Sequence, residues 1–174
     1  MAFSDEMNRL IDHVIENGIK RGIEVTLANQ CGRSALILIY AGIDAMATLN
    51  MPESQVEVKP DDFKAWIDKY IRSSGFKQVS ADEFYGSRCG LLHQFGVESR
   101  LSRAQQCRII AYAGASVPQG TISCVPKIIV VPVLALKDAF FNGINQCLKD
   151  LSEDGTKAMI VEKRLKEFIV DMSR

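Results

Sequence analysis

The spacing of apolar residues constrains this chain more than any other feature, because they recur at intervals of three and four over much of its length. In the first segment, residues 4–29, the apolar positions are Met7, Leu10, Ile11, Val14, Ile15, Ile19 and Ile23. This spacing predicts one face of a long helix. The stretch "NQCGR", with Gly32, is expected to end it. A second, more deeply buried helix is expected at 34–49.

Further segments carry helix-start signals or the same helical spacing. Pro60 suits the first turn of a helix, where its missing amide hydrogen costs nothing. The stretch "SADE" has the spacing of a capping box, in which Ser80 and Glu83 each bond to the other's backbone amide. The additional helices predicted in this way cover 60–73, 80–95, 133–151 and 156–172.

Two segments rich in Ile and Val, 106–114 and 121–131, interrupt the helical pattern. Separated by "ASVPQG", they are expected to form the two strands of a β-hairpin. Pro126 and Pro132 place the second strand at a sheet edge or limit its length, because proline has no amide hydrogen to donate. The predicted fold is therefore mainly α, an antiparallel helical bundle with a small β-hairpin insertion.

The length of the chain fits a single domain over residues 1–174. It is 47% hydrophobic and 24% charged, and it is long enough to bury a sizeable core. Within that domain we expect a helical core at about 4–96, the hairpin at about 106–131, and C-terminal helices at about 133–172.

Charge and cysteine usage argue against several classes of function. The 21 Lys and Arg balance 21 Asp and Glu, so contact with a polyanion must come from a local patch. The five cysteines are scattered, and His13, expected at the surface or at an interface, lies far from His93 in the sequence. We therefore expect reduced thiols in the cytoplasm, no metal site and no other cofactor. Neither the N-terminus nor the apolar runs at 34–49 and 128–136 fit a signal peptide or a membrane span.

The stretch "YGSRCGLLHQFG" at 85–96 places Arg88 five residues before His93, inside a predicted helix. Imidazole titrates near neutrality and can move a proton, while guanidinium offers a permanent charge and paired donors to phosphate. RNA carries its own nucleophile, the 2′-hydroxyl, so such a pair could support cleavage without a metal. Helix positions five apart differ by about 140°, so Arg88 and His93 do not lie on the same stripe of the helix. Cys89, four residues before His93, is the residue that lies directly beneath it. Collaboration between Arg88 and His93 then depends on side-chain reach or on a second subunit.

Asp44 and Cys89 are candidates for supporting roles. Asp44 is the acidic residue of an otherwise apolar helix, and a buried acid needs a partner. It could orient Arg88 or His93, although Arg33 is an equally good partner. Cys89 and His93 could instead form a thiolate–imidazole dyad, but no oxyanion hole is evident nearby.

The remaining candidates flank the motif. Tyr85 and Ser87 could contact phosphate or base, or they could be a packed ring and an ordinary helix hydroxyl. Arg100, Arg103 and Arg108 could hold an RNA backbone as a local basic patch, or they could be solvated surface residues.

Two segments, "SALILIYAGIDAMA" and "YGSRCGLLHQFG", resemble the HEPN superfamily (higher eukaryote and prokaryote nucleotide-binding domains), and most closely its small bacterial members. Arg88 and His93 match that superfamily's Arg-x4–6-His signature, and the resemblance covers about 5–96. It implies a helical bundle that forms a homodimer, in which two motifs face each other as one metal-independent RNase site. It also implies a toxin or phage-defence role beside an antitoxin protein, with His93 as general acid and base and Arg88 stabilising the phosphate.

The residue after Arg88 departs from the family pattern. Active members usually carry Asn, Asp or His there, whereas this chain has Cys89, a weak hydrogen-bond donor. Some HEPN-type domains bind nucleotides or protein partners without cleaving RNA. Two functions therefore stay open, a metal-independent endoribonuclease and a non-catalytic binding domain, beside a helical scaffold with no site.

Overall fold

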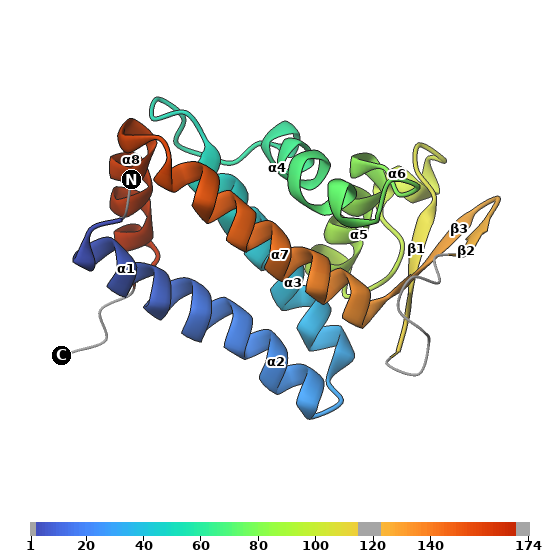
Figure 1. The fold of residues 1–174 in the computed structure, drawn as a ribbon. Helices are drawn as coiled ribbons and strands as arrows, with labels where there is room; N and C mark the ends of the chain where they lie inside the picture. The colour runs from blue at the N-terminus through green and yellow to red at the C-terminus, as the bar shows by residue number, and fades with distance from the viewer. Residues whose placement is uncertain (1–2, 115–122, 170–174) are drawn as a thin grey trace.

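The computed structural model describes residues 3–114 and 123–169 of the chain. Over these residues the protein is mainly helical, and its strands form one small sheet at one end of the helices (Figure 1). The buried side chains form one continuous hydrophobic core that draws on every long helix and on the sheet.

The predicted N-terminal helix is confirmed as a continuous helical stretch. It consists of α1 (Asp5–Ile11), a π-helical segment (Asp12–Lys20) and α2 (Arg21–Ala28). Ser4 caps its start, because its hydroxyl accepts from the Met7 amide at 3.0 Å. The chain turns at Gln30, which has a left-handed backbone (φ 59°). The predicted stop residue, Gly32, is instead the first residue of the next helix.

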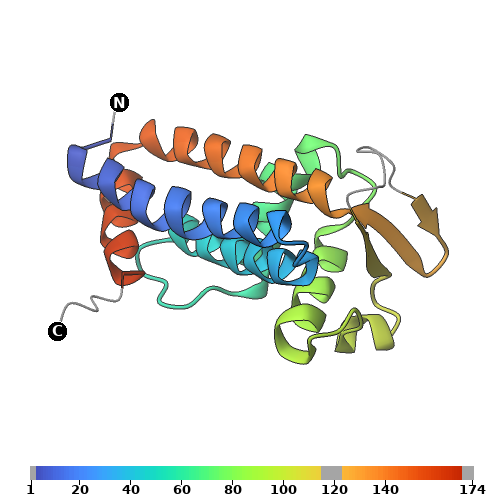
Figure 2. The same cartoon turned by 90° about the horizontal axis from the view of Figure 1, so that it is seen from below.

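The helix α3 (Gly32–Asn50) lies at the centre of the molecule, beside the N-terminal helices and α7 (Val133–Ser152) (Figures 1 and 2). Gly42 marks the place where the three meet. A Cβ atom at this position would lie 2.6 Å from the Phe140 ring and 2.9 Å from Ile19. The close approach of these helices therefore requires a glycine here.

By length and composition α3 is apolar enough to cross a membrane. Its buried residues, however, contact the surrounding helices of this molecule, and half of its most apolar stretch is inside the protein. A buried core helix of a protein in water has the same composition.

The predicted helices after α3 are also present. Pro60 is the first residue of α4 (Pro60–Trp66), which continues through a π-helical segment (Ile67–Ile71) and a short 3₁₀ turn (Arg72–Ser74). α5 (Ala81–Gln94) begins at the predicted capping box. The Ser80 hydroxyl accepts from the Glu83 amide at 3.2 Å, and the Ser80 amide donates to the Glu83 carboxylate at 2.7 Å. A further short helix, α6 (Arg100–Arg103), was not predicted.

The predicted hairpin between 106–114 and 121–131 is wrong. The sheet has the order β1-β3-β2, in which β1 (Ile109–Ala113) pairs in parallel with β3 (Ile128–Pro132). The hairpin lies within the second segment, where β2 (Ser123–Val125) turns at Pro126 into the antiparallel β3. Pro126, in the turn before β3, and Pro132, its last residue, bound this strand and limit its length, but β3 is the central strand and not an edge strand. Residues 115–122 lie outside the described part of the chain.

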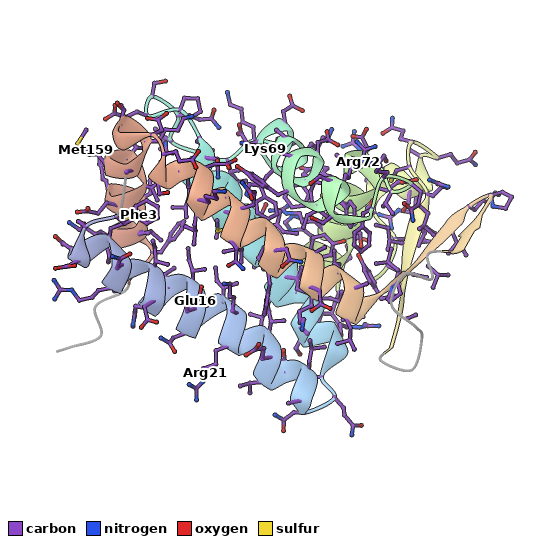
Figure 3. All side chains as sticks on the ribbon, in the orientation of Figure 1. Phe3, Glu16, Arg21, Lys69, Arg72 and Met159 are labelled. Atoms are coloured by element: carbon purple, nitrogen blue, oxygen red, sulfur yellow. The ribbon has the colours of Figure 1, made fainter. Side chains whose placement is uncertain are left out.

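The C-terminal part is helical, as predicted. α7 matches the expected 133–151, and α8 (Gly155–Glu167) starts where the Asp154 carboxylate accepts from the Lys157 amide at 3.1 Å. α8 ends before the predicted residue 172; 170–172 lie outside the described residues. Figure 3 shows Arg21 and Met159 pointing away from the helices, on the solvent side of the molecule.

A buried arginine fastens α8 to the end of α3. Arg164 is 7% exposed, and its guanidinium donates to the Met51 carbonyl at 2.5 Å and to the Pro52 carbonyl at 2.7 Å. Carbonyl groups just beyond a helix end have no partner within the helix, so a side chain or water must supply one.

We expect Arg164→Ala to lower the free energy of unfolding by about 2 kcal/mol, because it leaves buried carbonyl groups without donors. Urea unfolding followed by circular dichroism measures the loss. Lys163→Ala, which changes an exposed neighbour, serves as the control and should change stability little. Equal effects of the two substitutions would contradict this account.

Candidate functional site

The candidate site lies where α5 passes the central helix α3. Glu83, which bonds to the Ser80 amide in the capping box of α5, also forms an ion pair with Arg108. Its carboxylate lies 2.5 Å from Nε of Arg108, and Arg108 also donates to the Gln78 carbonyl at 3.1 Å. Burial by itself raises the pKa of Glu83, but the hydrogen bonds from Arg108 and from the Ser80 amide outweigh it and leave that pKa below its ordinary value.

Two glycines of the motif bring the following chain segment close to α5. A Cβ atom on Gly86 would lie 2.7 Å from Sγ of Cys107, and one on Gly90 would lie 2.8 Å from the Glu98 carbonyl oxygen. The chain therefore folds back directly over the helix after it ends. The sequence around Gly86 and Gly90 is typical of a helix and does not reveal this role, because the contact involves residues that follow the helix.

The structure brings Arg88, His93 and Asp44 together within one chain. The Arg88 guanidinium donates from Nε to the Asp44 carboxylate at 2.9 Å, and its Nη2 lies 2.9 Å from the same oxygen. Its Nη1 lies 3.0 Å from Nε2 of His93. Arg33, the alternative partner for Asp44, donates instead to the Phe95 carbonyl at 2.9 Å. The reach of the Arg88 side chain is thus sufficient for contact with His93.

The Arg88–Asp44 ion pair is mostly buried, while His93 is exposed; the two side chains of the pair are each 20% exposed. Burial opposes the charge on Arg88, but the hydrogen bond that Arg88 donates to the Asp44 carboxylate outweighs this effect and raises the pKa of Arg88. Burial also raises the pKa of Asp44, against the opposing attraction of Arg88 and His93. Because a guanidinium can only donate, its contact with His93 requires a lone pair on Nε2 of the imidazole.

A chain of hydroxyl groups links α5, β1 and α3 beside this ion pair. Ser87, the residue before Arg88, is 3% exposed and its hydroxyl lies 2.6 Å from the Tyr112 hydroxyl. The Tyr112 hydroxyl in turn hydrogen-bonds to that of Tyr40, which precedes Asp44 by one helical turn. Burial raises the pKa of Tyr40 to about 12, and that of Tyr112 well above its ordinary value, so both hydroxyls keep their protons.

Tyr85 and Cys89 contact the site from the other side of α5. The half-buried ring of Tyr85 packs edge-on against Phe63, with ring centroids 5.7 Å apart, and the Arg88 guanidinium lies 6.0 Å from its centroid. Cys89 interacts with both Tyr85 and Arg88. The structure therefore places Ser87 in the core and Tyr85 at the border of the site.

The three arginines of the predicted basic patch lie in different surroundings. Arg108 is directed to the buried Glu83 and so holds the start of α5. Arg103 donates to the side-chain carbonyl of Gln94 at 3.0 Å, near the end of α5. Arg100 is exposed on α6. RNA binding by Arg100, Arg103 and Arg108 stays a prediction.

Among residues 3–114 and 123–169, no group of three or more His, Cys, Asp or Glu side chains could hold a metal ion. Cys31, Cys89, Cys107 and Cys147 are free thiols. Comparison with protein-family models, with curated proteins and with solved structures found no match to the chain.

We expect Glu83→Gln to flatten the acid dependence of stability. The pKa of Glu83 in the folded protein lies below its ordinary value of 4.5. Its contribution is therefore fully present above pH 4.5 and is lost as the pH falls through the lowered folded value. Urea unfolding at neutral pH and at several acid pH values should show the advantage of the wild type over Glu83→Gln shrinking in acid. Glu98→Gln, an exposed neighbour, is the control; a gap for Glu83→Gln that does not change with pH would refute this assignment.

Proposed function

We propose that the protein is a metal-independent endoribonuclease of HEPN type, acting as a homodimer with a composite site. The observation that supports this proposal best is the 3.0 Å contact between Nη1 of Arg88 and Nε2 of His93. It joins a fixed positive charge to an exposed imidazole, and these are the two groups that RNA cleavage without a metal requires.

The contacts suggest how the two groups share the reaction. Arg88 binds the scissile phosphate through Nη1, which releases the lone pair of His93. That imidazole accepts the proton of the 2′-hydroxyl as its oxygen attacks phosphorus. The bond from phosphorus to the 5′-oxygen breaks, leaving a 2′,3′-cyclic phosphate, and the partner subunit's His93, in its protonated imidazolium form, donates a proton to the departing oxygen. Proton exchange with water then returns both histidines to their starting states. No redox step and no metal are needed.

Asp44 is a positioning residue in this proposal. It accepts from Nε and Nη2 of Arg88, so the remaining Nη1 group is directed toward His93. A guanidinium fixed on one edge loses less conformational freedom when it binds phosphate on the other.

The wider proposal follows from the Arg-x4-His motif on α5 in a mainly helical protein. It includes an antiparallel HEPN-like bundle, a cytoplasmic site of action, and a toxin–antitoxin or phage-defence role beside an antitoxin protein.

A non-catalytic nucleotide- or partner-binding domain is the second candidate function. Two observations favour it: Asp44 already balances the charge of Arg88, and Cys89 occupies the position where active HEPN members carry a stronger hydrogen-bonding residue. A site of this kind could bind a phosphate group without cleaving its ester.

We expect the purified protein to cleave single-stranded RNA in the presence of EDTA. Because proton transfer by a positioned side chain contributes about 10²–10⁴-fold, His93→Ala should lower the rate at least about a hundredfold, and Arg88→Ala similarly. His13→Ala, which removes the exposed histidine of the N-terminal helix, should cleave like the wild type. Gel analysis of a labelled RNA gives the rates. Absence of cleavage together with a nucleotide-induced rise in Tm would support the second function instead.

The composite site predicts a specific result when subunits are mixed. An excess of inactive His93→Ala chains should form mixed dimers and reduce wild-type activity well below the value expected from dilution. The mixture must be refolded or co-expressed so that subunits exchange, and light scattering after gel filtration verifies the dimer mass. Activity proportional to the amount of wild-type chain would show that each chain works alone.

A further inference from the structure

The last residues of α5 gather arginines from different parts of the fold. Three consecutive residues, the last two of the helix and the residue that caps it, each contact one guanidinium. Arg88 of α5 contacts His93, Arg103 of α6 contacts Gln94, and Arg33 of α3 contacts Phe95. Asp44 balances Arg88, whereas the partners of Arg33 and Arg103 are uncharged. This gathering is a local positive patch on a chain whose net charge is zero.

Phe95 stands at the centre of this patch in an unusual conformation. Its backbone is left-handed (φ 52°, ψ 28°) and 60% of the residue is exposed. Helix ends with this backbone usually carry glycine, because a side chain there is strained. Here Gly96 comes one residue later, and a large apolar ring occupies the strained position.

Arg33 fixes the orientation of the Phe95 ring. Its guanidinium carbon lies 5.0 Å from the ring centroid, and its Nη1 donates to the carbonyl of the same residue at 2.9 Å. The guanidinium therefore covers one face of the ring, while much of the remaining ring surface is open to solvent. Arginine and aromatic side chains in this arrangement are the groups on which unpaired bases stack.

We propose that Phe95, backed by Arg33, is a stacking platform for one unpaired base of single-stranded RNA, with Arg103 contacting the adjoining backbone. This inference rests on the proposed nuclease function and specifies its substrate. His93 and Phe95 are two residues apart, so their Cα atoms are within about 7.6 Å. The stacked base thus belongs to a nucleotide next to the scissile phosphate. Bases in a duplex are covered on both faces and cannot use the platform.

The test measures binding separately from cleavage. The probe is a fluorescein-labelled single-stranded oligoribonucleotide of mixed sequence, fully 2′-O-methylated so that it has no nucleophile, and binding is followed by fluorescence anisotropy in EDTA. Phe95→Ala should weaken binding on the order of tenfold, whereas Phe95→Trp should bind close to wild type. Phe168→Ala, which removes another exposed phenylalanine beyond the end of α8, is the matched control and should have no effect. The same probe annealed to its complement should bind equally to the wild type and to Phe95→Ala.

Phe95→Gly separates a loss of binding from a loss of folding. Since glycine relieves the left-handed strain, this variant should have an unchanged or higher Tm and still bind the probe about tenfold more weakly. If Phe95→Gly instead has a lower Tm, and its weaker binding results from partial unfolding, the proposal is overturned. So would a wild type that does not bind the single strand, or binding that is independent of Phe95.

The outcomes also distinguish this inference from the proposed function. If the wild type binds the probe through Phe95 but never cleaves unmodified RNA, the platform stands and the nuclease proposal fails. If the wild type cleaves RNA while Phe95→Ala binds and cleaves normally, the reverse holds. If Phe95→Ala converts a dimer into a monomer in light scattering, the ring is a contact between subunits, and the platform proposal fails.

Discussion

The ion pair between Arg88 and Asp44 is the interaction on which the site depends. It joins α5 to the central helix α3 at a place where each side chain is only 20% exposed. Removing either partner would leave a mostly buried charge without compensation, which costs far more than the intact pair contributes. The pair also explains how an otherwise apolar helix carries an acidic residue near the core. It is also the contact that anchors the Arg88 guanidinium to the central helix while Nη1 faces His93.

The surroundings of the pair restrict how α5 can move. The hydroxyls of Ser87, Tyr112 and Tyr40 connect the motif helix, the strand β1 and α3 one helical turn from Asp44. Such a buried network is favourable only when each member finds a partner, so it selects a single arrangement of the three elements. The small sheet therefore has a structural role at the site, because it supplies the middle hydroxyl of this network.

Local signals made most of the helices predictable, and long-range contacts account for what was missed. The capping box at Ser80 and Pro60 at the first turn of α4 depend on neighbouring residues alone, and both were found in the sequence. The parallel pairing of β1 with β3 joins segments that are distant in sequence, and no local pattern specifies it. The left-handed residues Gln30 and Phe95 were missed for another reason. Glycines follow both positions in the sequence, and a propensity argument assigns the left-handed backbone to glycine.

The geometry of the Arg88 guanidinium also suggests how it could bind a phosphate although Asp44 already balances its charge. Asp44 occupies the edge formed by Nε and Nη2, and only Nη1 contacts His93. An incoming phosphate would therefore compete with the imidazole and not with the carboxylate. Because the exchanged partner is exposed, displacing it costs little, while the carboxylate keeps the guanidinium in place. On the proposed function, the step that binds the phosphate also separates Nη1 of Arg88 from Nε2 of His93, which leaves that nitrogen free to act as the base.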